Sequence, residues 1–388
     1  MSAPRTRAPV YLDHNATTPV DPRVVGAMAP YWTERFHNPS SPYPPSAVVR
    51  QAIADARAAL ARLVGARPEG VVFTGGGTES DNWALRAGFA RGRGRRRLVV
   101  SAIEHPAVLE TAAALGREGA EVVSVPVDAH GVVAVEALEK VLDERVALVS
   151  VMLASNEIGT IQPVAEVSRR AHAVGALVHT DASQAVGKIP VDVEALGVDL
   201  LTVAGHKLYA PKGVGALVIA GDLGLEPLLA GGGQEGGRRS GTENVPAIVG
   251  LGEAARLAGA WLAGPGPRRQ GRLRDTLESR LRDALARVRV FGPPAPRLPN
   301  TLAIAVAGFT GAELLAACPE ILAGTGSACH HPGDAGSPTL RAMGVDAATA
   351  RGLVRLSLGR ATTGREVGRA AAALVAAALG RGGTSEEA

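Results

Sequence analysis

The chain has 388 residues, of which 41 are Lys or Arg and 37 are Asp or Glu, so its net charge at neutral pH is only +4. This modest charge, with 46% apolar residues, argues against a nucleic-acid-binding protein and against a disordered chain. The start lacks the apolar segment of a signal peptide and no segment approaches eighteen uninterrupted apolar residues, so we expect a cytoplasmic protein that does not enter a membrane.

Short apolar segments alternate with helical patterns along the first 260 or so residues. The segment 46–65 is typical of a helix, because apolar residues recur at steps of three and four and a glycine ends the pattern. Strands and helices alternating at this spacing predict an α/β fold with a mostly parallel sheet covered by helices. Predicted strands lie at residues 70–73, 97–100, 120–125, 146–151, 176–179 and 199–203.

A break rich in Gly, Pro and Arg at residues 263–269 precedes a charged helix, and a strand pattern resumes at residues 300–306. Such composition shifts are typical of domain boundaries. We therefore predict a large domain of residues 15–262 and a smaller C-terminal α+β domain of residues 263–388. Residues 1–14 are expected to pack with the small domain.

Polar residues follow five of the predicted strands. Ligands of parallel α/β sheets bind beyond the carboxyl ends of the strands, so these residues are the first candidates for a site. The glycine turn TGGGTES at Thr74 leads into a helix start that suits a phosphate, although an ordinary loop would look the same. Any single buried Asp or His would more often be structural. The other strand ends carry His105, Asn156, Asp181 with Gln184, and His206 with Lys207.

Lys207 is one of only four lysines in a chain that otherwise uses arginine. Only an amine can lose its proton and become a nucleophile, since guanidinium stays charged at any working pH. Pyridoxal phosphate needs a lysine that holds its aldehyde as a Schiff base, a carboxylate beside its pyridine nitrogen and a loop for its phosphate. The strand ends offer these three groups.

Ten motifs in order make the chain resemble the cysteine desulfurase and selenocysteine lyase family, class V members of the fold-type I pyridoxal-phosphate enzymes. The resemblance runs from about Tyr11 to Thr363. It implies an α/β fold, with a large cofactor-binding domain and a smaller C-terminal domain. The motifs are YLDHNATTPVDP, NPSSPY, FTGGGTESDN, EHPAV, NEIGTIQP, HTDASQAVGK, AGHKLYAPKGVGAL, GGGQEGGRRSGTENV, GTGSACHH and RLSLGRATT.

The resemblance implies a role for each matching residue. Lys207 would be the Schiff-base lysine, and Asp181 the partner of the pyridine nitrogen. His105 would stack on the cofactor. Arg355 would hold the substrate carboxylate, where a planar bidentate fork suits the task. The remaining implied contacts are Gln184 with the phenolic oxygen, Asn156 beside that oxygen and the substrate carboxylate, Gly77, Thr78 and His206 with the phosphate, and Thr242 with the phosphate of the other subunit of a homodimer.

Cys329 would be the nucleophile that takes the substrate's sulfur. Glycine-rich and proline-rich stretches flank it, so we expect an exposed and reactive thiol. Cys318 lies in an apolar run and is expected to be a core residue. No metal site is expected, because the adjacent Cys329, His330 and His331 would rarely converge on one ion.

The family resemblance predicts conversion of L-cysteine to L-alanine, with sulfur transferred to Cys329 as a persulfide and then to an acceptor protein for iron–sulfur cluster or other thio-cofactor biosynthesis. Release of selenium from L-selenocysteine is the alternative, since NPSSPY, RLPNT and ACHHPGDAGSPTLRAMG look more like the lyases. A non-catalytic scaffold and another class V aminotransferase remain as further alternatives. Two residues depart from the family pattern: Ala204, where a phosphate-binding serine is common, and Pro106, after the stacking His105.

Overall fold

Apolar strands of four or five residues build the centre of the molecule. In the computed structural model, which describes residues 8–326 and 336–380, every residue of β3, β5, β7 and β8 is buried. Continuous apolar strands of this kind are typical of a sheet that is covered on both faces. The strands of this sheet are β2 (Val71–Thr74), β3 (Arg97–Ser101), β4 (Glu121–Val125), β5 (Val146–Ser150), β6 (Leu177–Asp181), β7 (Leu200–Ala204) and β8 (Gly215–Ile219).

The seven strands lie in the order β2-β8-β7-β6-β5-β3-β4. The five strands from β7 to β4 are parallel, whereas β8 runs antiparallel to both β7 and β2. The predicted α/β fold with a mostly parallel sheet is therefore confirmed. The carboxyl ends of the parallel strands share one edge, and the loops that follow them carry the polar residues singled out above.

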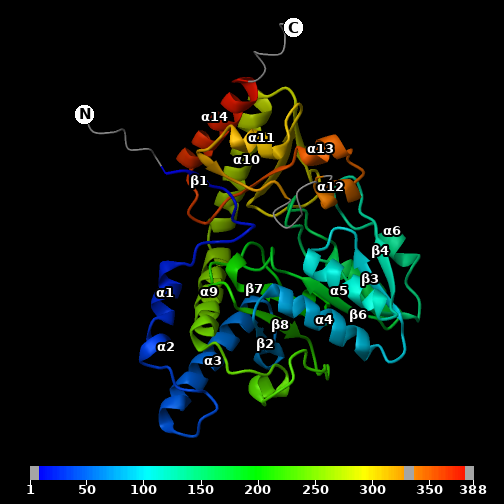
Figure 1. Ribbon diagram of the computed structural model, residues 1–388, viewed down its shortest axis with the longest axis vertical. Coiled ribbons are helices and arrows are strands. Elements are labelled where there is room, and N and C mark those ends of the chain that lie inside the picture. The colour runs from blue at the N-terminus through cyan, green and yellow to red at the C-terminus, as the bar shows by residue number, and fades with distance from the viewer. Residues whose placement is uncertain (1–7, 327–335, 381–388) are drawn as a thin grey trace.

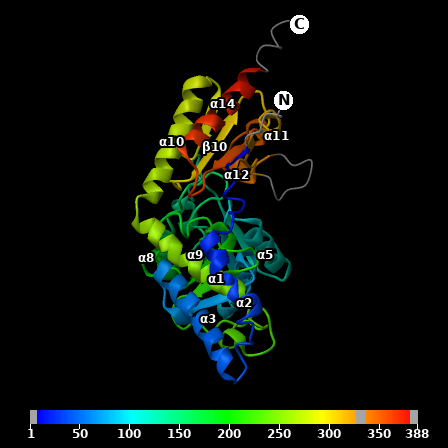
Figure 2. The ribbon, with the colours of Figure 1, turned by 90° about the vertical axis from the view of Figure 1, so that its left-hand side faces the viewer.

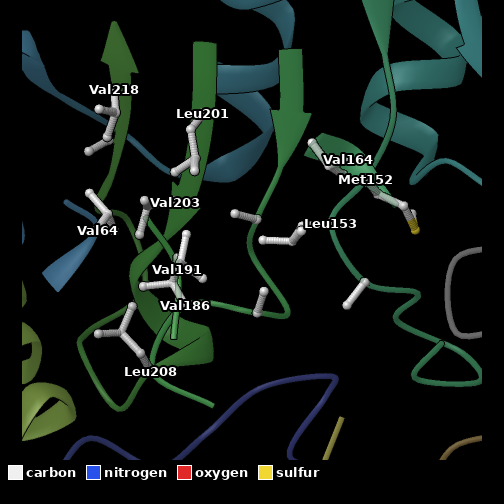
Figure 3. Close-up of a cluster of buried hydrophobic side chains, with 14 of the residues drawn as sticks. Val64, Met152, Leu153, Val164, Val186, Val191, Leu201, Val203, Leu208 and Val218 are labelled. Carbon is white, nitrogen blue, oxygen red and sulfur yellow. The ribbon is translucent and has the colours of Figure 1, made fainter. Parts of the chain in front are cut away.

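In the central strands, successive residues pack into cores on opposite faces of the sheet. Leu201 and Val203 of β7 and Val218 of β8 join one cluster with side chains of the surrounding loops (Figure 3). Leu200 and Leu217, which come next to them in sequence, pack instead with Trp83 of α4. Because both faces of the sheet are sealed in this way, its strand ends are held in fixed positions.

Helices cover both faces of the sheet (Figure 1). α4 and α5 lie together on one face, and α3 and α9 pack against each other on the other. α9 is long and apolar enough to cross a membrane by length and composition, but 56% of its apolar window is buried inside the protein. The helices of this lobe are α1 (Pro22–Met28), α2 (Pro30–Thr33), α3 (Pro44–Leu63), α4 (Gly77–Arg91), α5 (Pro106–Arg117), α6 (Val135–Glu139), α7 (Val164–Ala173), α8 (Val193–Leu196) and α9 (Val245–Ala263).

A second lobe, built mainly from the C-terminal part of the chain, has its own core (Figures 1 and 2). Its antiparallel sheet has the order β12-β10-β9. A separate short parallel pair, β1 and β11, joins the N-terminal residues to this lobe. Its elements are β1 (Val10–Tyr11), α10 (Gly266–Ala284), β9 (Val288–Phe291), β10 (Thr301–Val306), α11 (Gly311–Ala316), β11 (Ile321–Leu322), α12 (Pro338–Ala342), α13 (Ala347–Arg351), β12 (Val354–Ser357) and α14 (Gly364–Gly380).

The break expected at residues 263–269 is shorter in the structure. α9 ends at Ala263 and α10 already begins at Gly266, with Pro265 as its N-cap. Proline is tolerated in the first turn of a helix, so a Pro-rich segment can start one. The division of the chain at residue 263 falls between these two helices and stays a prediction.

Candidate functional site

A cavity of about 380 Å³ lies at the carboxyl ends of the parallel strands. Its volume is in the range of small-molecule and cofactor sites. Pro338, Thr339 and Arg355 of the C-terminal lobe complete its wall. It collects nine of the predicted site residues from separate loops and strands: Gly77, Thr78, His105, Asn156, Asp181, Gln184, His206, Lys207 and Arg355.

The glycine turn after β2 forms one end of the cavity. Gly76 has a φ of 147°, a conformation open essentially to glycine, and α4 begins immediately after it without a side-chain cap. A Cβ atom on Gly77 would lie 3.1 Å from the Cβ of Ala204 and 3.3 Å from Oγ of Ser183. The uncapped N–H groups of α4 and this close fit make a cradle for a phosphate.

His206 and Lys207 lie in the short 3-10 helix η2 (Gly205–Lys207) that follows β7. Nζ of Lys207 donates to the carbonyl oxygens of Asn15, at 2.7 Å, and Ala16, at 2.8 Å. His206 Nδ1 lies 3.1 Å from Oγ1 of Thr17. Burial, assisted by the charge of Lys207, lowers the pKa of His206 to about 4, so this ring is neutral at physiological pH.

Asp181 is the last residue of β6 and is 7% exposed. Its Oδ1 accepts a hydrogen bond of 2.9 Å from the backbone N–H of Ser183. Three further buried acids, Asp81, Glu104 and Glu157, line the cavity with it. Burial and the neighbouring charge of Asp181 raise the pKa of Asp81 well above its ordinary value. The carboxyl groups of Asp81 and Asp181 thus interact across the cavity wall.

Glu104 forms the floor of the cavity beside His105. Its Oε1 accepts hydrogen bonds from the Ser101 hydroxyl and, at 2.7 Å, from the N–H of Met152. Its Oε2 is buried and has no hydrogen-bond partner in the described part of the chain. Burial raises the pKa of Glu104 to about 8, which matches an acid that is protonated in the folded protein.

His105 is the N-cap of α5, and its Nδ1 accepts the N–H of Ala107 at 3.1 Å. An accepting Nδ1 leaves the proton of the neutral ring on Nε2. Burial lowers the pKa of His105, so the ring is neutral and suited to stacking. The departure at Pro106 also has a local explanation, because it is the first residue of α5, where proline is favoured.

Arg355 of β12 reaches the cavity from the C-terminal lobe and is 4% exposed. Its guanidinium donates to Oδ1 of Asp13 at 2.7 Å and to the carbonyl oxygen of Asn156 at 3.1 Å. Its Nε is buried and has no hydrogen-bond partner among residues 8–326 and 336–380. A Cβ on Gly324 would lie 2.9 Å from Nη2 of Arg355 and 3.0 Å from Oδ1 of Asp13, so a larger residue here would displace this ion pair.

Comparison with known proteins identifies the family to which this chain belongs. The family model of the class-V aminotransferases matches residues 10–369. A cysteine desulfurase of Gluconacetobacter diazotrophicus is 45% identical over 364 residues, which cover 93% of this chain and 91% of the relative. The chain belongs to the class-V aminotransferase family.

Solved structures agree with this assignment. A NifS-like protein has a TM-score of 0.88 and 38% sequence identity, covering 95% of this chain and 98% of its own. A structure described as SspA in complex with cysteine has a TM-score of 0.81 and 31% identity, covering 91% of this chain and 99% of its own. The expected family and fold are thus confirmed.

The cofactor of this class-V aminotransferase is pyridoxal phosphate. The residues present fit it: Lys207 for the aldehyde, Asp181 for the pyridine nitrogen, and the uncapped start of α4 for the phosphate. Ala204 offers no hydroxyl to that phosphate. Ser183, which lines the cavity next to Gly77, places a hydroxyl in the same region.

Two predicted site residues are not in this cavity. Thr242 is exposed and lines a separate cavity of about 240 Å³ with Arg239 and Asn244, so its role in a second subunit stays a prediction. Cys329 lies outside the described residues, and its role stays a prediction too. Cys318 is fully buried, and burial raises its pKa to about 11, as expected of a core residue.

The sequence patterns did not single out three side chains that contact the site: Asp13, Asn15 and Lys188. Asp13 and Asn15 belong to the N-terminal motif YLDHNATTPVDP, and Lys188 ends the motif HTDASQAVGK. None of them directly follows a predicted strand of the large sheet. The signals that could have found them are these motifs and, for Lys188, its spacing of four residues from Gln184.

Proposed function

We propose that this protein is a pyridoxal-phosphate-dependent cysteine desulfurase, which converts L-cysteine to L-alanine and removes the sulfur. The observation that carries the proposal is that the amine of Lys207, the carboxylate of Asp181 and the guanidinium of Arg355 line one cavity. A general aminotransferase could use the same three groups. The relatives named cysteine desulfurases, at 41–45% identity, favour removal of sulfur.

Arg355 is placed to bind the carboxylate of the amino-acid substrate. Asp13 and the Asn156 carbonyl hold its guanidinium from two sides, while its Nε remains without a partner in the described part of the chain. A carboxylate would satisfy the remaining donors with charge-assisted hydrogen bonds. Because the guanidinium is already oriented, little side-chain entropy would be lost on binding.

Lys207 would move the proton at Cα of the substrate. Two backbone carbonyls hold its amine, and its histidine neighbours His105 and His206 have lowered pKa values. Pyridoxal phosphate supplies an electron sink when bound, and the carboxyl group of Asp181 would pair with its pyridine nitrogen. His105 would pack its neutral ring on the cofactor.

Cys329 would accept the sulfur. In this step the Cβ–S bond of the substrate breaks and its electron pair stays with Cβ, which gains the proton that completes alanine, while the Cys329 thiolate forms a new S–S bond with the released sulfur. The products are L-alanine and a Cys329 persulfide, so no external oxidant or reductant is needed. An acceptor protein would then take the sulfur for iron–sulfur cluster or other thio-cofactor biosynthesis in the cytoplasm.

We also propose that the active unit is a homodimer, with Thr242 completing the phosphate site of the partner. In support, Thr242 is exposed and lies outside the cavity that contains Lys207. Trp32 of α2 and Phe36, three residues after the end of α2, are 62% and 68% exposed. Large exposed apolar side chains close together mark association surfaces.

Alanine release from L-cysteine and from L-selenocysteine, by the parental protein and by Cys329→Ala, tests the proposal. We expect cysteine turnover that falls at least about 100-fold in Cys329→Ala, because a catalytic nucleophile is lost. Undiminished turnover of cysteine in Cys329→Ala would refute the persulfide step. Turnover of selenocysteine alone would make the protein a selenocysteine lyase. Pyruvate in place of alanine would contradict both the desulfurase and the lyase activity.

A further inference from the structure

Lys188 is a buried amine beside the cavity that the proposed chemistry does not use. Its side chain is 8% exposed, and Nζ donates to Oε1 of Gln184 at 2.5 Å and to Oδ1 of Asn15 at 3.1 Å. Both acceptors are neutral amide oxygens. Burial of a cation beside neutral partners is costly, so the presence of an amine here needs a reason.

The charges that act on Lys188 increase this cost. Burial lowers the pKa of Lys188 well below its ordinary value, and the positive charges of Lys207, Arg355 and Arg360 lower it further. His14 and His206 also interact with this amine, and burial lowers the pKa of each to about 4. Charged or neutral, the lysine amine still has N–H groups to donate to Gln184 and Asn15.

A lysine partner decides which way the Gln184 amide points. In the structure Nζ donates to Oε1 of Gln184, so the oxygen of the amide faces Lys188 and its NH₂ group faces away. Nε2 of Gln184 donates one of its two hydrogens to the carbonyl oxygen of Asn15 at 3.0 Å. The same carbonyl also accepts a hydrogen bond from Nζ of Lys207. The NH₂ group of Gln184 and the amine of Lys207 are therefore neighbours at the wall of the cavity.

We propose that Lys188 is a positioning residue, which fixes the Gln184 amide with its N–H groups toward the phenolic oxygen of bound pyridoxal phosphate. The proposal rests on the proposed cofactor chemistry. With Lys188 in place, the phenolic oxygen would receive a hydrogen bond from the Gln184 amide. A reversed amide would instead place Oε1 of Gln184 against the phenolic oxygen. Lys188 also joins the same network to Asn15, and Asn300 donates to that side chain at 2.9 Å.

The readout is the visible absorbance of the pyridoxal-phosphate holoprotein, titrated with pH in the absence of any substrate. A donor to the phenolic oxygen favours its ionised form, so the pH midpoint of the spectral change is lowered. Lys188→Met keeps the length and removes the donor. We expect its midpoint to rise by about one pH unit relative to the parental protein.

Two comparisons separate positioning from a purely structural role. Lys140→Met makes the same exchange at an exposed lysine next to α6, and its midpoint should equal the parental value. Gln184→Leu should raise the midpoint, and the double variant Lys188→Met/Gln184→Leu should add nothing, because both changes remove one donor. An unchanged midpoint in folded Lys188→Met, or shifts that add, would overturn the proposal.

If Lys188→Met does not fold, Gln184→Glu provides the test. A glutamate can pair with Lys188 but has no N–H to donate, so its midpoint should also rise, and an unchanged midpoint would overturn the proposal. The outcome is independent of desulfuration. If the variants show the predicted shifts but the parental protein releases no alanine from cysteine, only the proposed reaction is refuted. If the midpoint of the variants is unshifted and the parental protein releases alanine normally, only the role of Lys188 is refuted.

Discussion

Lys207 and Lys212 lie five residues apart but have very different surroundings. The Lys207 amine lies at the wall of the cavity, bonded to the carbonyl oxygens of Asn15 and Ala16. Lys212 is exposed after Pro211. Only the first position requires a group that can lose its proton and form an imine.

Replacement of each lysine by arginine should therefore have different consequences. We expect Lys207→Arg, reconstituted with pyridoxal phosphate, to lack the visible absorbance of the bound cofactor, because a guanidinium cannot bond to the aldehyde. Lys212→Arg should keep the parental spectrum. A parental spectrum in Lys207→Arg would refute the role given to this residue.

Glu104 should make the stability of the protein depend on pH. Its pKa is about 8 in the folded protein and near 4.5 in the unfolded chain, so the folded state binds the extra proton. Its contribution is complete below pH 4.5 and is lost as pH rises toward 8. We expect urea unfolding to show a loss on the order of a few kcal/mol between pH 5 and 8 that is absent in Glu104→Gln. Equal pH dependence in both proteins would contradict this assignment.

The sequence could identify residues that directly follow strands, such as Asp181 and Lys207, because parallel strands bring their carboxyl ends to one edge. It could not identify Asn15 from the same pattern. Asn15 is 192 residues from Lys207, and only the path of the N-terminal segment between the lobes brings its carbonyl to Nζ. Such long-range contacts leave no local periodicity in the sequence.

At the scale of elements, the close approach of α9 to α3 depends on a glycine. A Cβ on Gly252 would lie 2.5 Å from Cα and 2.6 Å from Cβ of Ala56. The backbone of α9 at Gly252 can therefore approach Ala56 of α3 this closely only because Gly252 has no side chain. Gly259, seven residues later in α9, has no heavy atom within 4 Å of its Cβ position in the described structure.

These two glycines provide a matched pair of substitutions. Gly252→Ala should destabilise the protein by about 1–3 kcal/mol, because the added methyl overpacks the contact with α3. Gly259→Ala should stabilise it by up to about 1 kcal/mol, since alanine favours a helix over glycine. Chemical denaturation of both variants measures the difference. Equal effects would show that the contact between α3 and α9 does not constrain Gly252.

Most strands could be placed from the sequence because their apolar runs are short and bounded by turn residues. The segment predicted at 199–203 appears as β7, Leu200–Ala204, and the segment at 146–151 as β5, Val146–Ser150. The start of α10 was placed wrongly, since Gly and Pro in its first turn looked like a loop. Strand direction at the edge, where β8 is antiparallel, depends on pairing that the local pattern does not contain.

At the scale of the whole molecule, the site draws on both lobes and, as proposed, on a second subunit. Arg355 comes from the C-terminal lobe, whereas Lys207 and Asp181 come from the large sheet. The β1–β11 pair anchors the N-terminal segment to the C-terminal lobe, and the residues that follow reach Lys207. Relative movement of the lobes would therefore change the distance between the substrate clamp and the catalytic amine.

Complementation between two inactive variants tests the role of Thr242 in the partner. Lys207→Ala lacks the amine, and Thr242→Ala should bind pyridoxal phosphate more weakly. If Thr242 acts across the interface, one site of a mixed dimer has Lys207 from one subunit and Thr242 from the other. We expect the co-expressed mixed dimer to hold about half of the cofactor that the parental protein holds. Either variant alone should hold less. No restoration in a proven mixed dimer would place Thr242 outside the partner's site.

The central claim is that this protein removes sulfur from cysteine and holds it on Cys329. A single turnover of the holoprotein with L-cysteine, in the absence of reductant, tests it most directly, with alanine quantified and the Cys329 peptide weighed by mass spectrometry. We predict one alanine per active site and one added sulfur atom on that peptide. Absence of alanine, or alanine formed while Cys329 gains no sulfur, would contradict the account.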